Sequence, residues 1–206
     1  MEERAIAGLT MDAATLTFRC RCQTLRGTIL DSSAGAATRC VCYCSDCQRF
    51  LRHLGHEALL DECGGTDLLQ TTPRRVRLDA GAEQIRCLQL TEGGVLRWFT
   101  ACCRTPIANT PASAGAPFAA LFLSNLEVSD PARLEASLGP VRHRIYGRMA
   151  RGTPPAGTHP GASLRHILRT VRLLLQWRLM GHARPSPFFD DRRQPVAPIE
   201  RVYVEA

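Results

Sequence analysis

The chain has 206 residues, of which 45% are apolar, and carries a formal net charge of +7 at pH 7. This apolar fraction allows a packed core and excludes a wholly disordered chain. The 26 basic residues are all Arg, and many lie between residues 142 and 201, so we interpret the charge first as a solvated basic surface of that segment. Nucleic acid is therefore an unlikely partner.

Residues 1–14 are predicted to be a leader without the basic region and apolar run of a secretory signal. No apolar run of roughly 18 residues follows, which predicts no membrane span. Ten cysteines in such a chain favour metal binding over disulfides, with a disulfide framework as the less favoured alternative. Cytoplasm is the expected compartment.

Residues 15–140 predict a mainly β domain. Short apolar stretches separated by Gly- and Asp-containing turns indicate successive strands, and a short helix is expected over residues 48–60, where Gly55 weakens the pattern. Residues 61–72 are predicted to be rich in turns. The strands are expected at residues 15–20, 27–30, 38–44, 74–78, 84–90, 95–99 and 118–123.

Residues 141–206 predict an extension whose main element is an amphipathic helix at about 163–180. Leu164, Leu168 and Leu175 belong to an apolar series at helical spacing, and Ser163 can cap the first turn. We expect the apolar face to pack on the β domain. A contact within a homo-oligomer and a contact with a membrane surface are the alternatives.

The densest chemical signal is the stretch of residues 40–47, which holds four cysteines: Cys40, Cys42, Cys44 and Cys47. If residues 40–44 are extended, the Cα atoms of Cys40 and Cys44 stand about 13 Å apart at roughly 3.3 Å per residue. Two thiolates on one zinc ion lie much closer, so both cannot ligate. Cys42, Cys44 and Cys47 can, which predicts a zinc site with an open, catalytic position. A closed site, with Cys40 or a distant residue as the fourth ligand, is the alternative.

The cysteine motifs resemble those of the glutathione-dependent formaldehyde-activating enzymes, a family that also includes centromere protein V. The resemblance covers about residues 15–128. The matching segments are Cys20-Arg21-Cys22 with Gly27, then Cys42-Tyr43-Cys44-Ser45-Asp46-Cys47-Gln48-Arg49, then Phe99-Thr100-Ala101-Cys102-Cys103-Arg104-Thr105-Pro106-Ile107.

The resemblance implies a fold of packed antiparallel β-sheets with two zinc sites. In that family one zinc is structural, and the cysteines matching it here are Cys20, Cys22 and Cys103, with Cys102 as an uncertain fourth. The second zinc has an open position and would be held by Cys42, Cys44 and Cys47. The implied activity is that of a carbon–sulfur lyase, which joins glutathione and formaldehyde into S-(hydroxymethyl)glutathione.

The chain departs from the family pattern at three positions. Tyr43 stands where the family usually has His, Thr100 replaces the first cysteine of the last motif, and Arg104 replaces its Gly. Adjacent cysteines on a regular strand point to opposite faces. We therefore expect the structural zinc site that includes Cys102 and Cys103 to be distorted or weak. An Arg beside the thiols is expected to lower their pKa.

Four further residues are weaker candidates. Cys63 and Cys87 are expected to be buried or idle, and His53 and His56 to be surface residues rather than ligands or proton carriers. We therefore expect a zinc-dependent enzyme that acts on a small thiol such as glutathione. The alternatives are a non-catalytic zinc-binding module whose basic tail contacts acidic partners or nucleic acid, and a metal or redox sensor.

Overall fold

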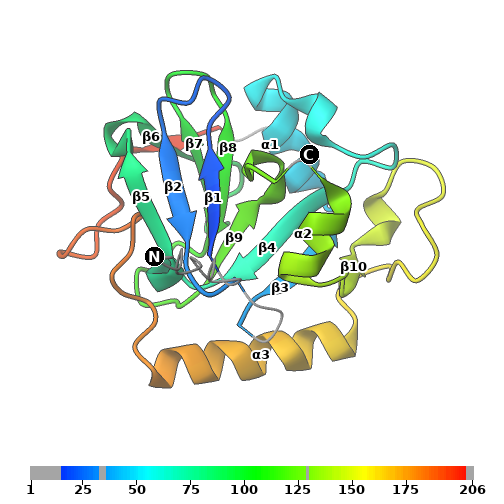
Figure 1. Cartoon of the computed structure of the whole chain (residues 1–206). Helices are drawn as coiled ribbons and strands as arrows, with labels where there is room; N and C mark the ends of the chain where they lie inside the picture. The colour runs from blue at the N-terminus through cyan, green and yellow to red at the C-terminus, as the bar shows by residue number, and fades with distance from the viewer. Residues whose placement is uncertain (1–14, 33–35, 129, 203–206) are drawn as a thin grey trace, which may run out of the picture.

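The computed structural model describes residues 15–32, 36–128 and 130–202. These residues form two β-sheets with three α-helices around them (Figure 1), and the mainly β character agrees with the sequence prediction. The smaller sheet is antiparallel and has the order β1 (Leu16–Arg19), β2 (Arg26–Ile29), β5 (Val76–Ala80). The larger sheet has the order β10 (His143–Ile145), β3 (Thr38–Cys42), β4 (Thr66–Thr71), β9 (Ala119–Phe122), β8 (Pro106–Thr110), β7 (Leu96–Thr100), β6 (Ile85–Gln89), β11 (Ile199–Arg201).

The larger sheet is mixed rather than purely antiparallel. Its six inner strands pair antiparallel, but β10 pairs parallel with β3, and β11 pairs parallel with β6. Both parallel edge strands come from the segment that the sequence predicted as an extension. That segment therefore completes the sheet at both edges.

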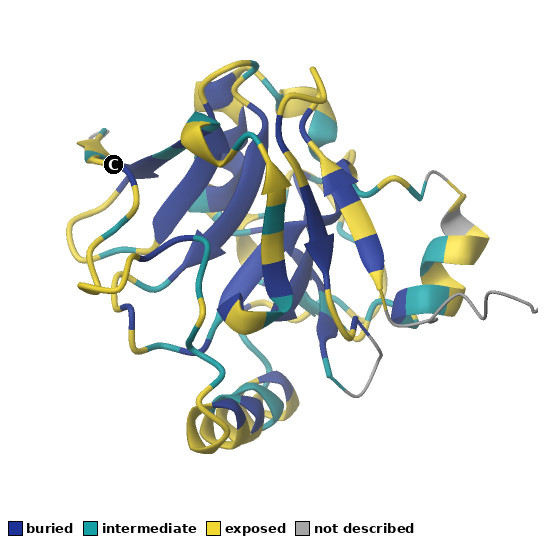
Figure 2. Cartoon of the chain, turned by 60° about the vertical axis from the view of Figure 1, so that its left-hand side comes forward, coloured by how far each residue is buried: buried dark blue, intermediate teal, exposed yellow. Residues whose placement is uncertain are grey.

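Two cores lie on the two faces of the larger sheet, which explains why β7, β8 and β9 are buried along their whole length (Figure 2). The core between the sheets includes Phe18, Ile29 and Trp98. The core on the other face includes Phe50 and Phe122 and lies beneath the first helix. Alternating side chains of each central strand reach both cores.

The helices are α1 (Ser45–Leu54), α2 (Pro131–Leu138) and α3 (Leu164–Leu179). Helix α1 ends at Gly55, which has φ 76°, and α3 begins after Ser163, whose side chain accepts a hydrogen bond from the His166 N–H. None of the helices in the described residues has the length and apolarity to cross a bilayer. Short 3₁₀ turns occur at Glu57–Leu59, Pro73–Arg75, Ala82–Gln84, Leu123–Asn125 and Gly147–Met149.

The predicted orientation of α3 is wrong. The helix packs on the body through His166, Leu173 and Trp177, whereas most of the predicted apolar series faces solvent. Apolar residues lie on two faces of this helix, and the longer aliphatic series does not include its largest apolar side chain, Trp177. Packing selects the face that carries the Trp.

Two other segments also differ from the sequence expectation. Residues 66–71, expected to be turn-rich, form the central strand β4. The Pro-punctuated tail after α3, which its sequence predicts to wrap the surface, enters the core instead, because Phe188 and Phe189 pack on Trp98 with ring centroids 5.2 and 5.9 Å away. Paired aromatic rings of this kind bury much apolar area.

Candidate metal centres

The three-cysteine cluster consists of Cys42, Cys44 and Cys47, whose Sγ atoms all lie within 4.8 Å of one another. Cys42 ends β3, Cys44 lies in the connection, and Cys47 lies in the first turn of α1. The reversal from strand to helix brings together thiols that an extended chain would separate. Cys40, two residues earlier on the same face of β3, is buried but is not part of this group.

Cys44 is the N-cap of α1. Its Sγ accepts a hydrogen bond from the Cys47 N–H over 3.4 Å, in the position where Ser or Asp oxygens usually cap a helix. A helix N-terminus favours negative charge, so this position suits a thiolate.

The three thiols differ in acidity. Hydrogen bonds from Cys42 and Cys44 hold the pKa of Cys47 well below its usual value, and the charge of Arg97 acts in the same direction. Hydrogen bonding to the other two thiols, together with burial, raises the pKa of Cys42. The hydrogen bond with Cys42 lowers the pKa of Cys44. The hydrogen bond with Cys47 and burial have the larger combined effect and raise the pKa of Cys44 to about 12. Of the three thiols, Cys47 is therefore the one that ionises most readily.

Arg97, which sequence reasoning missed, brings a positive charge to this cluster. It lies on β7, is 2% exposed, and its Nη1 lies 3.8 Å from Cys47 Sγ and 3.2 Å from Asn109 Oδ1. Asp46 is 3.7 Å from its Nη2, and the Phe50 ring centroid is 5.4 Å from its guanidinium carbon. The only sequence signal was a charged residue within a strand of otherwise apolar character.

Two tyrosines flank the three-cysteine cluster with different roles. Tyr146 packs against the core that contains Cys42 and Cys47, and burial, followed by the nearby thiols, raises its pKa. It is half-buried and has φ 61°, an uncommon backbone conformation for a bulky residue. Tyr43, by contrast, donates its hydroxyl to Asp61 over 3.1 Å and so fixes the loop before β4.

The four-cysteine cluster consists of Cys20, Cys22, Cys102 and Cys103, whose Sγ atoms also lie within 4.8 Å of one another. The Sγ–Sγ distances are 3.5 Å for Cys20–Cys22, 3.3 Å for Cys22–Cys102, and 3.8 Å for both Cys20–Cys102 and Cys102–Cys103. Sulfurs at 2.3 Å from a tetrahedral zinc ion lie about 3.8 Å apart. The four thiols therefore fit a tetrahedral metal ion closely.

This cluster joins the two sheets. Cys20 and Cys22 lie in the β1–β2 turn of the smaller sheet, and Cys102 and Cys103 in the β7–β8 turn of the larger one. The adjacent cysteines can point to one place because they lie in a turn and not on a strand. The Arg21 N–H also donates to Thr105 Oγ1 over 3.1 Å, which holds the two turns together.

The two substitutions in the last motif have specific structural roles. Thr100 Oγ1 lies 3.5 Å from Cys103 Sγ and accepts the Thr105 N–H over 3.1 Å. Burial raises the pKa of Cys103, but hydrogen bonds from Thr100 and Thr105 have the larger effect and lower this pKa to about 5. Arg104 adopts φ 55° and donates to the His53 carbonyl over 3.0 Å. The lowered pKa of Cys103 thus arises from hydroxyl groups rather than from the expected Arg.

The remaining candidates lie outside both clusters. Cys63 is partly exposed and donates to the Thr153 carbonyl over 3.3 Å, and Cys87 is buried in β6, where burial raises its pKa to about 12. His56 Nε2 lies 3.2 Å from the Cys103 carbonyl oxygen, and His53 joins neither cluster. All ten cysteines are free.

Known proteins give a family but no function. No curated protein matches the chain. A crystal structure of a Rhodobacter sphaeroides protein, a structural genomics target, aligns with 19% identity and a TM-score of 0.38 over 58% of this chain and 94% of that chain. The chain matches the Family of unknown function (DUF6151) over residues 13–200, and it therefore belongs to that family.

Proposed function

We propose that the chain is a zinc enzyme of the glutathione-dependent formaldehyde-activating type, with carbon–sulfur lyase-like activity on a small thiol or thiol–aldehyde adduct. The observation that carries the proposal is the three-cysteine cluster, which gathers three thiols without Cys40. Three protein ligands leave a fourth position for substrate, as in catalytic zinc sites. The motif resemblance suggests glutathione as the thiol.

The two clusters would then divide structure from chemistry. The four-cysteine cluster has a full ligand set and joins the two sheets, so we assign it a structural zinc ion. The three-cysteine cluster would hold the second ion, and there an open zinc site supplies a Lewis acid that binds a thiol as thiolate or polarises a carbonyl oxygen. Cytoplasmic location remains an expectation of the sequence.

Arg97 supplies charge balance at the proposed site. Three thiolates around a divalent cation leave one net negative charge, which is costly in an apolar core. The buried guanidinium 3.8 Å from Cys47 Sγ offsets that charge and holds one ligand in place. Tyr146 packs against the core that contains Cys42 and Cys47, and its hydroxyl would donate a hydrogen bond to a substrate oxygen.

The proposed reaction balances without a redox partner. The sulfur of glutathione forms a bond to the carbonyl carbon of formaldehyde, the carbon–oxygen π bond breaks, and the thiol proton ends on the resulting hydroxyl. The reverse reaction breaks the same carbon–sulfur bond. No oxidant, reductant or second cofactor is required.

The test combines metal analysis with the reaction itself. Zinc per chain is measured for the purified protein and for Cys44→Ala, with Cys63→Ala as a matched control outside both clusters. Glutathione is titrated into cobalt-substituted protein while the thiolate-to-metal absorption is followed, and the exchange of labelled formaldehyde with its glutathione adduct is measured by NMR.

We expect the thiol-sensitive absorption and the exchange rate above background to disappear in Cys44→Ala and to persist in Cys63→Ala. A thiolate-to-metal absorption that glutathione does not change, together with exchange at the uncatalysed rate, would instead indicate a non-catalytic zinc-binding module.

A further inference from the structure

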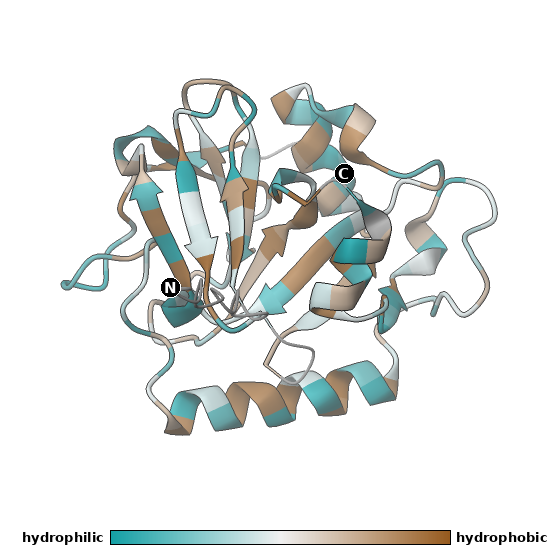
Figure 3. Ribbon diagram, in the orientation of Figure 1, coloured by the Kyte–Doolittle hydropathy of each residue, from teal (hydrophilic) through white to brown (hydrophobic). Residues whose placement is uncertain are grey.

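Helix α3 lies across one end of the molecule (bottom of Figure 1) and turns an apolar ridge away from it. The outward ridge consists of six side chains that are 44–89% exposed. They recur at intervals of three and four residues, except for one adjacent pair, and lie opposite Leu173 and Trp177, which face the body. Apolar patches accordingly recur along α3 in Figure 3. The ridge is formed by Leu164, Ile167, Leu168, Val171, Leu175 and Leu179.

The apolar surface continues from the ridge onto the body. A hollow of about 450 Å³ lies along one flank of α3, where Val171 and Leu175 face Pro117 and Phe118. A contiguous exposed apolar surface of this kind marks an interaction site rather than ordinary solvent-facing surface.

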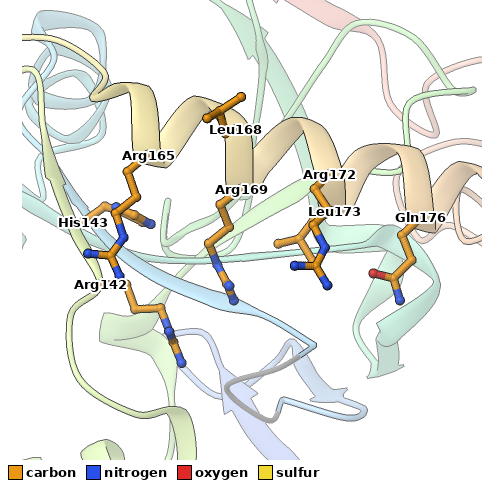
Figure 4. A pocket seen from close by; sticks show the side chains of 8 residues that line it. All are labelled: Arg142, His143, Arg165, Leu168, Arg169, Arg172, Leu173 and Gln176. Atoms are coloured by element: carbon orange, nitrogen blue, oxygen red, sulfur yellow. The ribbon is translucent and has the colours of Figure 1, made fainter.

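The other flank of α3 is cationic. Arg142, Arg165, Arg169 and Arg172 line a hollow of about 590 Å³ between α3 and the strand β10. Figure 4 shows the guanidinium groups of the helix on the side of α3 opposite to Leu168. The basic groups and the ridge are therefore neighbours on one helix and face different directions.

Three of these cations, Arg142, Arg165 and Arg172, have little internal compensation. Helix α3 contains no Asp or Glu, and within the described part of the chain no carboxylate forms an ion pair with Arg142, Arg165 or Arg172. Arg169 donates to Thr38 Oγ1 over 3.0 Å, and burial, then the neighbouring arginines, lower its pKa. The hollow therefore favours an anion.

One kind of partner can contact the apolar ridge and hollow and also neutralise the arginines. A second copy of the chain would match the same patch to itself, which sets one arginine row near another and supplies no negative charge. A nucleic acid would satisfy the arginines but leave the ridge in water. An anionic lipid surface accepts aliphatic side chains below its headgroups and offers phosphate groups at the level of the arginines.

We propose that α3 is an interfacial helix that docks the protein on an anionic phospholipid surface, with the outward ridge among the acyl chains and Arg142, Arg165 and Arg172 on headgroup phosphates. This site is separate from both cysteine clusters, so the proposal does not depend on the proposed activity.

The experiment is co-sedimentation of the full chain with sucrose-loaded vesicles, made of phosphatidylcholine alone or of phosphatidylcholine with phosphatidylglycerol. We expect binding to the anionic vesicles that salt weakens. Each arginine near an anionic surface strengthens binding about fivefold, so Arg165→Gln/Arg172→Gln should lower the partition coefficient roughly thirtyfold. The control Arg133→Gln/Arg192→Gln removes the same charge from exposed positions elsewhere.

A second pair of variants tests the ridge. Leu168→Ser/Leu175→Ser should abolish sedimentation, whereas Leu30→Ser/Val95→Ser, at exposed apolar positions outside α3, should not. Far-UV circular dichroism and zinc content check that each variant folds. Wild-type protein that stays in the supernatant with anionic vesicles would overturn the proposal. So would equal binding to neutral vesicles, or a solution dimer that Leu168→Ser/Leu175→Ser converts to monomer.

Discussion

The Nη1 atom of Arg97 lies 3.8 Å from the Sγ atom of Cys47, although the two residues are fifty positions apart and both are buried. A buried guanidinium is stable only where negative charge and hydrogen-bond acceptors surround it. Asp46 and Asn109 provide part of that environment. The thiolate of Cys47 provides the rest, so the arginine and the three-cysteine cluster stabilise each other.

Replacement of Arg97 should therefore weaken metal binding at one cluster alone. We expect Arg97→Met to lower zinc affinity at the three-cysteine cluster by about 10- to 100-fold, the usual effect of removing a partner of a metal ligand. Competition with a chromophoric chelator measures both sites in one sample. The four-cysteine cluster is the internal control, and equal losses at both clusters would point to general unfolding instead.

The boundary of the three-cysteine cluster can be tested with neighbouring thiols. Cys44→Ala removes a ligand and should cost the metal ion of that cluster, whereas Cys40→Ala should leave metal content unchanged because Cys40 is outside the group. Metal analysis of dialysed protein decides between the two outcomes. Loss of metal in Cys40→Ala would instead favour a closed four-ligand site.

Metal binding at the three-cysteine cluster should release protons. The pKa of Cys44 is raised to about 12 and that of Cys42 is also raised, so both thiols are protonated at pH 7 before binding, whereas the pKa of Cys47 is lowered and this thiol ionises most readily. Roughly two protons leave for each ion bound, and apparent affinity should fall about a hundredfold per unit decrease of pH. Calorimetry in buffers of different ionisation enthalpy counts the protons, and release of none would contradict the assigned protonation states.

The four-cysteine cluster should contribute to the stability of the whole fold because it joins the two sheets. With free zinc at about a thousand times its dissociation constant, binding stabilises the folded state by about 4 kcal/mol. Cys102→Ser should lose most of that contribution. Chemical unfolding with and without a chelator measures it, and wild-type stability that the chelator leaves unchanged would argue against a structural metal ion.

The orientation of α3 predicts a large effect on stability for one of its residues and a negligible effect for another. Trp177 is 3% exposed and Leu179 is 89% exposed. We expect Trp177→Ala to lower the free energy of unfolding by about 3–5 kcal/mol and Leu179→Ala to change it by no more than about 0.5 kcal/mol. Urea denaturation compares the variants directly. The reverse order would restore the orientation that the hydrophobic pattern predicted.

Local patterns in the sequence were informative where the structure is local. The spacing of Cys42, Cys44 and Cys47 depends on one strand-to-helix turn, and the start of α3 depends on Ser163, so both are readable from neighbouring residues. The approach of Arg97 to Cys47 depends instead on the order of strands in the sheet. No local pattern encodes that order.

The features that the sequence misassigned have separate causes. Cys102 and Cys103 meet at one place because a turn, and not a strand, carries them. The orientation of α3 was decided by the packing of Trp177 against the body, which outweighed a longer aliphatic series. Phe188 enters the core because its ring packs against that of Trp98, which lies ninety positions earlier in the chain.

The parallel edge strands have a consequence for biosynthesis. Strands β10 and β11 close the two edges of the larger sheet, yet both are made after all the strands they cover. While the ribosome is still translating residues 143–201, β3 and β6 have unpaired backbone groups, and β3 carries Cys40 and Cys42 beside its open edge. Early capture of metal by the three-cysteine cluster would engage Cys42 as a ligand while that edge is still open, before β10 covers it.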